Sequence, residues 1–125
     1  MWRDFLLLTV SGAVGTISRF IVAKSVIRAC GNEFPWGTIV VNLIGCFLFG
    51  LIWSLTEHRV VLYGHARLIL LTGFMGAFTT FSTFAFETCA LLQKLEYGPA
   101  LANGLGQVVL GVALMFAGQM IGRQF

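Results

Sequence analysis

The sequence predicts an all-helical integral membrane protein that crosses the bilayer four times. Of its 125 residues, 58% are hydrophobic and only 10% are charged, whereas an ordinary soluble domain carries about 25% charged residues. About 20 apolar residues span a bilayer as an α-helix, so four spans with short connections use almost the whole chain. We expect a single transmembrane domain over residues 1–125, with spans at about 5–27, 38–55, 67–92 and 100–122.

Charge and cysteine usage narrow the classes of function. The net charge is +3, but the eight basic residues stand singly around the ends of the expected spans. That distribution is typical of anchoring in membrane lipid and gives no sign of nucleic-acid binding. The three cysteines form no CxxC pair, so we expect packing residues instead of disulfides or a metal site. The N-terminal MWRDFLLLTVSG lacks a small-residue cleavage site, which predicts a retained first helix.

The first expected span combines small residues with one charge. Ser11, Gly12 and Gly15 permit close approach of a neighbouring helix. Arg19 is unusual, because a charge within a span is costly unless the side chain reaches the interface or pairs. A short turn follows, CGNEFPWG, in which Pro35 breaks the helical pattern.

The second expected span is apolar except for Asn42, which lies three residues before Gly45. A lone Asn in a span either holds two helices together or lines a water-filled route, and the sequence leaves both roles open. The connection after this span, TEHRVVLYGHAR, is the most polar stretch of the chain and holds His58 and His65.

The third expected span contains the most unusual stretch, TGFMGAFTTFSTFAFE at residues 72–87. It carries five hydroxyl side chains, five Phe and two Gly within an apolar run, which a lipid-facing helix does not need. One interpretation is a helix packed through small residues, with Ser and Thr bonding back to their own carbonyls. The other is a helix that loosens and exposes its carbonyls where they are buried in protein or line a polar cavity.

The fourth expected span begins after Pro99, a residue well suited to a helix start, and contains no charge. Asn103 and Gln107 are four residues apart, so both lie on one face of the helix. Gly118 and Gly122 form a GxxxG pattern, which predicts close approach of another helix.

The distribution of Lys and Arg bears on orientation in the membrane. With four spans, one side would hold Arg3, Arg59, Arg67 and Arg123, and the other Lys24, Arg28 and Lys94, with Arg19 as a further candidate. Lys/Arg asymmetry in short loops sets orientation, so a chain with almost none is expected to insert both ways. Mixed insertion predicts an antiparallel homodimer whose two-fold axis lies in the membrane plane.

The polar residues within the spans indicate ion conduction and not catalysis. No paired carboxylates, Ser/His/Asp set or phosphate loop occurs among the spans, so we expect no enzyme. Neutral donors and acceptors can replace the water around a small ion without holding it too tightly. Phe81 and Phe84 project to one side of a continuous helix, where their positive ring edges would attract a small anion. The alternative is that both rings are core packing.

Three segments carry a family resemblance: GAVGTISR at 12–19, WGTIVVNLIG at 36–45 and TGFMGAFTTFSTF at 72–84. Over nearly its whole length the sequence resembles the Fluc (CrcB) family of fluoride channels. The resemblance implies a dual-topology homodimer in the cell inner membrane, with two pores that export toxic fluoride by passive electrodiffusion.

The resemblance also implies roles for individual residues. Phe81 and Phe84 correspond to the two pore phenylalanines, and Asn42 to the pore asparagine of the second span. Gly76 and Thr79 correspond to residues whose backbone carbonyls, from both subunits, hold a structural sodium ion on the two-fold axis. We therefore expect the helix to break between Thr72 and Thr80 and to leave these carbonyls without helical partners.

Further pore residues follow from the same resemblance. Ser82 and Thr83 correspond to accompanying hydroxyl groups, and Asn103 to the start of a polar track that Gln107 would continue on the fourth span. Arg19 matches a family arginine near the pore vestibule.

Two positions depart from the family pattern. Ala77 stands where a second glycine is common, and Ala85 where a serine is common after the last Phe of the motif. Neither change removes a backbone carbonyl, so the expected sodium ligands are unaffected.

Two other classes of protein compete with a channel. A small proton-coupled multidrug exporter also has four spans, but it needs an ionisable group deep in the membrane, typically an acid in the first span. Here the first span offers only Asp4 at its start, and Glu87 lies late in the third span. A structural or assembly subunit would use the polar residues only to hold helices together.

Overall fold

The computed structural model describes residues 1–57 and 65–125, and every regular element in these ranges is helical. The elements are α1 (Trp2–Cys30), α2 (Trp36–Glu57), α3 (His65–Arg67), the π-helical η2 (Leu68–Met75), α4 (Gly76–Phe78), α5 (Phe81–Gln93) and α6 (Tyr97–Gly122). Within these described ranges, four helical stretches are long and apolar enough to cross a membrane: α1, α2, the composite His65–Gln93 and α6. The predicted all-helical fold with four spans is confirmed, and each expected span lies inside one of these stretches.

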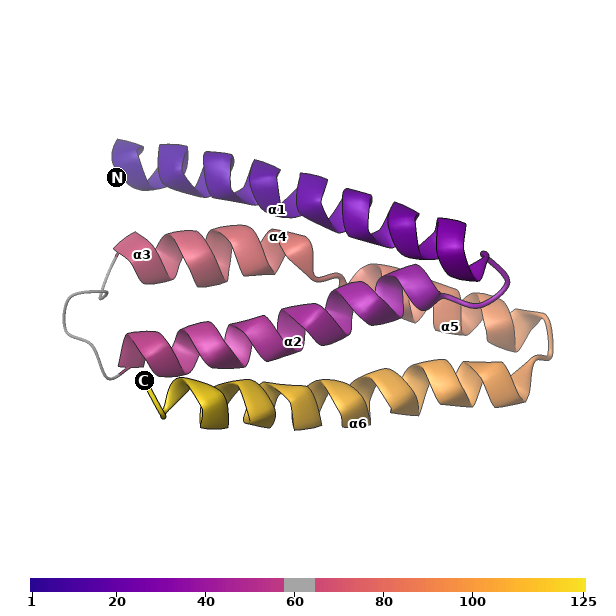
Figure 1. Ribbon diagram of the computed structural model, residues 1–125. Helices are drawn as coiled ribbons and strands as arrows, with labels where there is room; N and C mark the ends of the chain where they lie inside the picture. The colour runs from indigo at the N-terminus through magenta and orange to yellow at the C-terminus, as the bar shows by residue number, and fades with distance from the viewer. Residues whose placement is uncertain (58–64) are drawn as a thin grey trace.

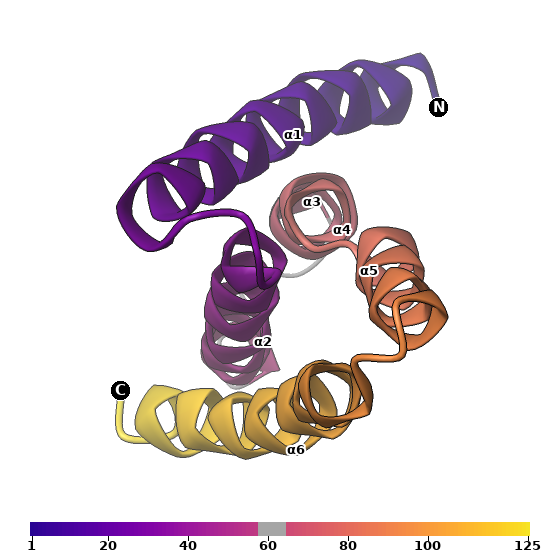
Figure 2. The same cartoon turned by 90° about the vertical axis from the view of Figure 1, so that its right-hand side faces the viewer.

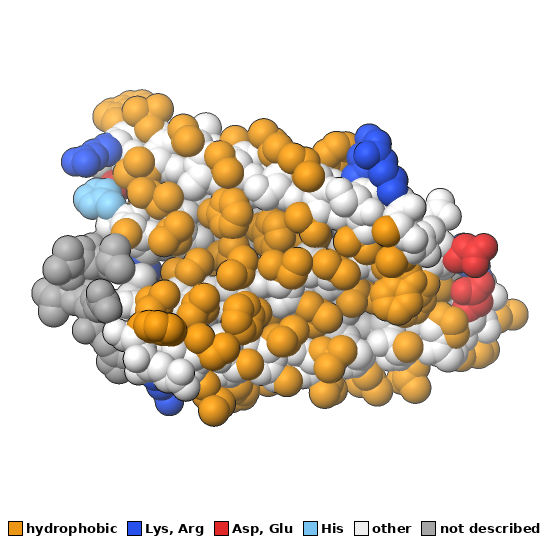
Figure 3. Space-filling model, viewed as in Figure 1, with side chains coloured by type: hydrophobic (Ala, Val, Ile, Leu, Met, Phe, Trp, Pro, Cys, Tyr) orange, Lys and Arg blue, Asp and Glu red, His pale blue; other side chains and the backbone are white. Residues whose placement is uncertain are grey.

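The four stretches form an elongated bundle in which both termini lie at the same end (Figure 1). Helix α2 packs most extensively along α6, while α1 packs on η2, α2 and α4, and α5 packs on α6. Seen from the end, α5 is displaced from the line of α3 and α4, so the third span is bent away where it breaks (Figure 2). Charged side chains gather toward the two ends, and hydrophobic side chains cover the middle (Figure 3).

Close packing between α2 and α6 depends on glycine. A Cβ atom built on Gly118 would overlap the carbonyl oxygen of Phe47 and lie 2.9 Å from the backbone nitrogen of Leu51. One built on Gly122 would lie 2.7 Å from Cβ of Ser54. The close approach predicted from the GxxxG pattern is therefore confirmed, and its partner is α2.

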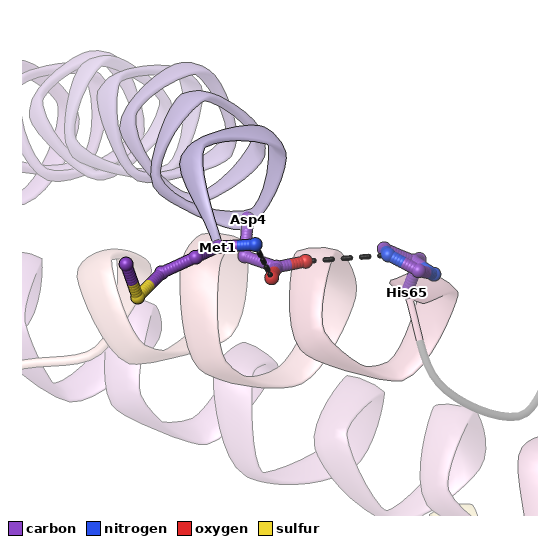
Figure 4. Close-up of polar contacts among 3 residues, drawn as sticks. All are labelled: Met1, Asp4 and His65. Carbon is purple, nitrogen blue, oxygen red and sulfur yellow. Dashed lines mark ion pairs between the residues drawn. The ribbon is translucent and has the colours of Figure 1, made fainter.

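A small ion-pair cluster ties the start of α1 to α3 (Figure 4). One carboxylate oxygen of Asp4 lies 3.2 Å from the N-terminal amine, and the other lies 3.2 Å from Nε2 of His65. All three groups are substantially exposed, so each pair is worth at most about 1 kcal/mol. His58 and Arg59, which the sequence places in the same connection, lie outside the described residues.

The buried hydrophobic core is formed by α2 and by the part of the third span that precedes the break. It consists of Val41 of α2, Leu71 and Met75 of η2, and Phe78 of α4, all nearly inaccessible. This cluster holds the first half of the third span against α2 up to the residue before the break.

The α2–α6 contact can be tested with two alanine substitutions in the same helix. Gly118→Ala is expected to lower the free energy of unfolding by about 1–3 kcal/mol, because the added methyl forces the two backbones apart. Gly106→Ala is the matched control, since a Cβ there meets nothing within 4 Å and Ala favours a helix over Gly by roughly 0.5–1 kcal/mol. Thermal unfolding in detergent measures both, and equal melting temperatures for the two variants would contradict this packing.

Candidate functional site

The third span breaks at two consecutive threonines. Thr79 (φ −81°, ψ 158°) and Thr80 (φ −148°, ψ 108°) are extended, while Gly76–Phe78 remain helical. The break thus lies at the end of the expected Thr72–Thr80 segment and not at Gly76, because the N–H and hydroxyl of Thr79 both still donate to the Met75 carbonyl. The preceding π-helical turns of η2 are the loosened part of the same segment.

The side chain of Asn42 replaces the helical partners of the broken backbone. Its Oδ1 accepts the N–H of Thr80 at 2.9 Å, and its Nδ2 donates to the Thr80 carbonyl at 3.1 Å. In an unbroken helix that N–H would donate to the carbonyl of Gly76. Of the two roles left open for Asn42, the structure shows that it holds neighbouring helices together, and its role in a water-filled route stays a prediction.

From Asn42 a chain of hydrogen bonds runs along the inner face of α6. Asn42 Nδ2 donates to Gln107 Oε1 at 2.8 Å, and Gln107 Nε2 donates to Asn103 Oδ1 at 2.7 Å. Asn103 Nδ2 donates to the hydroxyl of Thr88 at 2.8 Å, and that hydroxyl donates to the Phe84 carbonyl at 2.8 Å. Asn103 is completely buried, so its hydrogen bond fixes the orientation of the Gln107 amide. Gln107 itself keeps one amide hydrogen that donates to no other described residue.

A cavity of about 260 Å³ lies at the break, between α2, α5 and α6. Its described lining consists of Asn42, Gly45, Cys46, Phe49, Thr79, Thr80, Phe81, Phe84, Gln107, Val108 and Met115. No Asp, Glu, Lys or Arg is among these lining residues. Both amide hydrogens of Asn42 and the hydroxyl hydrogens of Thr79 and Thr80 already donate within the protein. The cavity is therefore mostly apolar and aromatic, carries no formal charge and has the remaining Gln107 amide hydrogen as its side-chain donor among the described lining residues.

The two phenylalanines expected at a pore stand together at this cavity. The ring centroids of Phe81 and Phe84 are 5.5 Å apart with the planes tilted by 49°. Phe84 is half-buried, whereas Phe81 is 78% exposed within the protomer. Phe81 is therefore not buried in the core of this protomer, and the pore role of the two rings stays a prediction.

Of the remaining expected site residues, two contact the break and two lie on the protomer surface away from the cavity. Thr83 stands next to the break, because its N–H and hydroxyl both contact Oγ1 of Thr80, which caps α5. Arg19 reaches the break from α1 and donates to the Thr79 carbonyl at 3.4 Å, so that carbonyl has no helical partner but is not free. Ser82 and Gly76 are exposed on the protomer surface and do not line the cavity at the break.

Sequence reasoning missed several members of the site. Thr80 is the residue that Asn42 binds, and Thr88 carries the polar chain back to α5. Near the other end of α5, the hydroxyl of Thr38 donates to a carboxylate oxygen of Glu87 at 2.8 Å. Spacing alone gives no signal for these pairs, because each joins different helices whose relative rotation the sequence does not state.

Comparison with known proteins assigns the chain to a family. Residues 6–119 match the family described as CrcB-like protein, Camphor Resistance (CrcB). The chain belongs to the CrcB family. The resemblance seen in the three sequence segments is thereby confirmed, and it covers nearly all of the chain.

Individual members of the CrcB family are similar over almost their entire length. A protein of Nitrosococcus oceani named fluoride-specific ion channel FluC is 49% identical over 123 residues, which cover 98% of both chains. One of the same name from Solidesulfovibrio magneticus is 51% identical over 116 residues, covering 93% of both chains. A third, from Geobacter sulfurreducens, is 44% identical over 119 residues, covering 95% of this chain and 96% of the relative.

The role of Asn42 in holding the break can be tested by deleting its amide. Asn42→Ala is expected to lower the free energy of unfolding by about 1–3 kcal/mol, because it removes the acceptor of the Thr80 N–H and the donor to the Thr80 carbonyl. Asn32→Ala removes the same amide from an exposed turn and is expected to change stability little. Thermal unfolding compares the two, and an Asn42→Ala protein as stable as the parent would show that Asn42 does not hold the break.

Proposed function

We propose that this chain forms a fluoride-selective channel through which toxic fluoride leaves the cell by passive electrodiffusion. Its CrcB relatives are named fluoride-specific ion channels, and ion channels are not enzymes. The observation that supports this function best is the uncharged cavity at the Thr79–Thr80 break, edged by Phe81 and Phe84 and by the amides of Asn42 and Gln107.

The chemistry of this cavity suits a small, strongly hydrated anion. The remaining Gln107 N–H and the ring edges carry partial positive charge and can replace part of the water around fluoride. Because no full charge faces the cavity, the anion is not trapped, and conduction requires binding weak enough to allow exit. Asn103 and Thr88 orient Gln107 through hydrogen bonds, so its remaining N–H is held in place before the ion arrives.

A second, inverted copy of the chain would complete the site. Phe81 borders the cavity, yet its ring is exposed in the protomer. Gly76, in the motif just before the break, is exposed as well. Opposite insertion of two copies is consistent with the nearly equal Lys and Arg counts on the two sides. We propose an antiparallel homodimer with two pores, located in the inner membrane of the cell.

We also propose a structural sodium ion between the two breaks. The Gly76 carbonyl has lost its helical donor to Asn42, and the Thr79 carbonyl keeps one lone pair beside its bond to Arg19. Neutral oxygens suit a hard cation, so these groups fit the ion. The positive charge of Arg19 near the Thr79 oxygen would weaken sodium binding. The ion would therefore need all four carbonyls, those of Gly76 and Thr79 from each of the two chains.

Fluoride efflux from proteoliposomes tests the function directly. The purified protein, reconstituted with internal fluoride, should release it when valinomycin and potassium remove the charge imbalance, and should release chloride far more slowly. Efflux that requires a proton gradient, or that carries a cationic drug in its place, would favour a small multidrug exporter. The position of Asp4 disfavours that reading, because its carboxylate is exposed at the start of α1 and not deep in the bundle.

Aliphatic substitutions test the role of the two rings. Phe81→Ile and Phe84→Ile are each expected to reduce fluoride flux at least about tenfold, which corresponds to roughly 1.4 kcal/mol, because they keep most of the volume but remove the positive ring edge. Phe86→Ile is the control, since Phe86 is 73% exposed on the same helix but does not line the cavity. Parental efflux from both pore variants would show that these rings only pack.

Cysteine labelling tests the inverted arrangement. A single cysteine added after Phe125, with the three native cysteines replaced by serine or alanine, should react with a membrane-impermeant maleimide from both sides of the membrane in comparable amounts. The reason is that almost no Lys/Arg asymmetry favours one orientation. Reaction from one side only, in cells and in inverted vesicles, would rule out the antiparallel dimer.

Exchange of sodium tests the proposed ion. Thermal unfolding after dialysis into choline chloride is expected to occur several degrees lower than in sodium chloride of equal ionic strength, because a ligand at 100 times its Kd stabilises by about 2.7 kcal/mol. The melting temperature should rise again with added sodium. A melting temperature that does not depend on sodium would contradict the site.

A further inference from the structure

A second cavity, of about 610 Å³, continues along the same face of α2 toward the end that holds both termini. Its described lining consists of Phe49, Trp53, Arg67, Leu68, Leu71, Thr72 and Gly76. Phe49 lines both this cavity and the one at the break. The two cavities are therefore neighbours that share Phe49 of α2 in their walls.

Arg67 is the only charged side chain among these lining residues, and it is held in an unusual way. Its guanidinium lies over the face of Trp53, 3.7 Å from the ring centroid. Trp53 in turn stacks on Phe49, with centroids 6.5 Å apart and planes within 10° of parallel. The three side chains form a column that leads from the charge to the cavity at the break.

One end of the Arg67 guanidinium lacks a hydrogen-bond partner. Its Nη2 atom is buried and meets no acceptor among the described residues, and none of their carboxylates forms an ion pair with it. A buried donor on a charged group is costly to leave unsatisfied. Arginine is also the side chain best suited to binding anions, so the arrangement calls for an anion as the missing acceptor.

We infer that Arg67, held by Trp53, is the residue that draws fluoride from water into the pathway at one mouth. This inference rests on the proposed channel function and identifies a further residue of the same pathway. Arg67 supplies the full positive charge that the cavity at the break lacks, so it can raise the local fluoride concentration while the neutral cavity sets selectivity. In an inverted dimer, each side of the membrane would have one such mouth.

Flux measured at two ionic strengths tests this role. Arg67→Gln should lower fluoride efflux about three- to tenfold at about 10 mM salt, since one charge acts at the lower end of the roughly 10- to 1,000-fold range of electrostatic steering. The deficit should shrink at about 1 M salt, where the Debye length falls to roughly 3 Å. Arg67→Lys should keep most of the flux. Arg123→Gln, at an exposed arginine expected on the same side, should match the parent at both salt concentrations.

A second measurement does not depend on fluoride conduction. In a Trp2→Phe, Trp36→Phe background, Trp53 is the only tryptophan of the chain. Iodide should quench its fluorescence at least about twofold less in the Arg67→Gln protein, while neutral acrylamide should quench both proteins equally. If the parent carries no fluoride but iodide quenching still depends on Arg67, the proposed function fails and the anion site stands.

Three results would overturn the inference. The first is an Arg67→Gln protein with parental efflux at low salt and parental iodide quenching. The second is a loss of flux that is equal at both salt concentrations and is shared by Arg67→Lys, which would assign Arg67 to packing on Trp53. The third is a deficit that appears only in vesicles containing phosphatidylglycerol and not in phosphatidylcholine, which would make a lipid phosphate the ligand.

Discussion

The pairing of the Asn42 amide with the backbone of Thr80 is the interaction on which the rest of this structure depends. Within a bilayer, an unpaired backbone group costs several kcal/mol, because no water is present to replace the lost helical partner. Asn42 offers an acceptor and a donor with the same spacing as a peptide group, so it satisfies the N–H and the carbonyl of Thr80 together. The helix of the third span can therefore end at Phe78 and begin again at Phe81 in the middle of the protein.

That break determines what surrounds the cavity. Because α5 leaves the line of α3 and α4, Phe81 and Phe84 border a space that a straight helix would fill. The same Asn42 amide reaches Gln107, which connects the break to the buried polar chain of α6. Each polar group in the chain is held by the next, so these side chains are fixed in place without a ligand.

The charged side chains of Arg19 and Arg67 lie outside the described lining of this cavity. The cavity at the break is neutral, and the neighbouring cavity carries the single cation of Arg67, stacked on Trp53. A charge at the centre would bind an anion too tightly to conduct, whereas a charge near water can attract the anion and release it. Arg19 adds a second cation, whose hydrogen bond is to the carbonyl of Thr79 at the break itself.

The sequence by itself determined the fold class, the four spans and the family, because hydropathy over 20 residues and the 72–84 motif are local properties of the chain. The run of hydroxyl residues and glycines left open whether the third helix would break, and the family resemblance favoured the break. Only the tertiary structure decided that the break falls at Thr79 and Thr80, that Asn42 holds it, and that Thr88 and Arg67 face their partners. These depend on how the helices are rotated and shifted against one another, and that is fixed by packing between residues distant in sequence, such as Gly118 against Phe47.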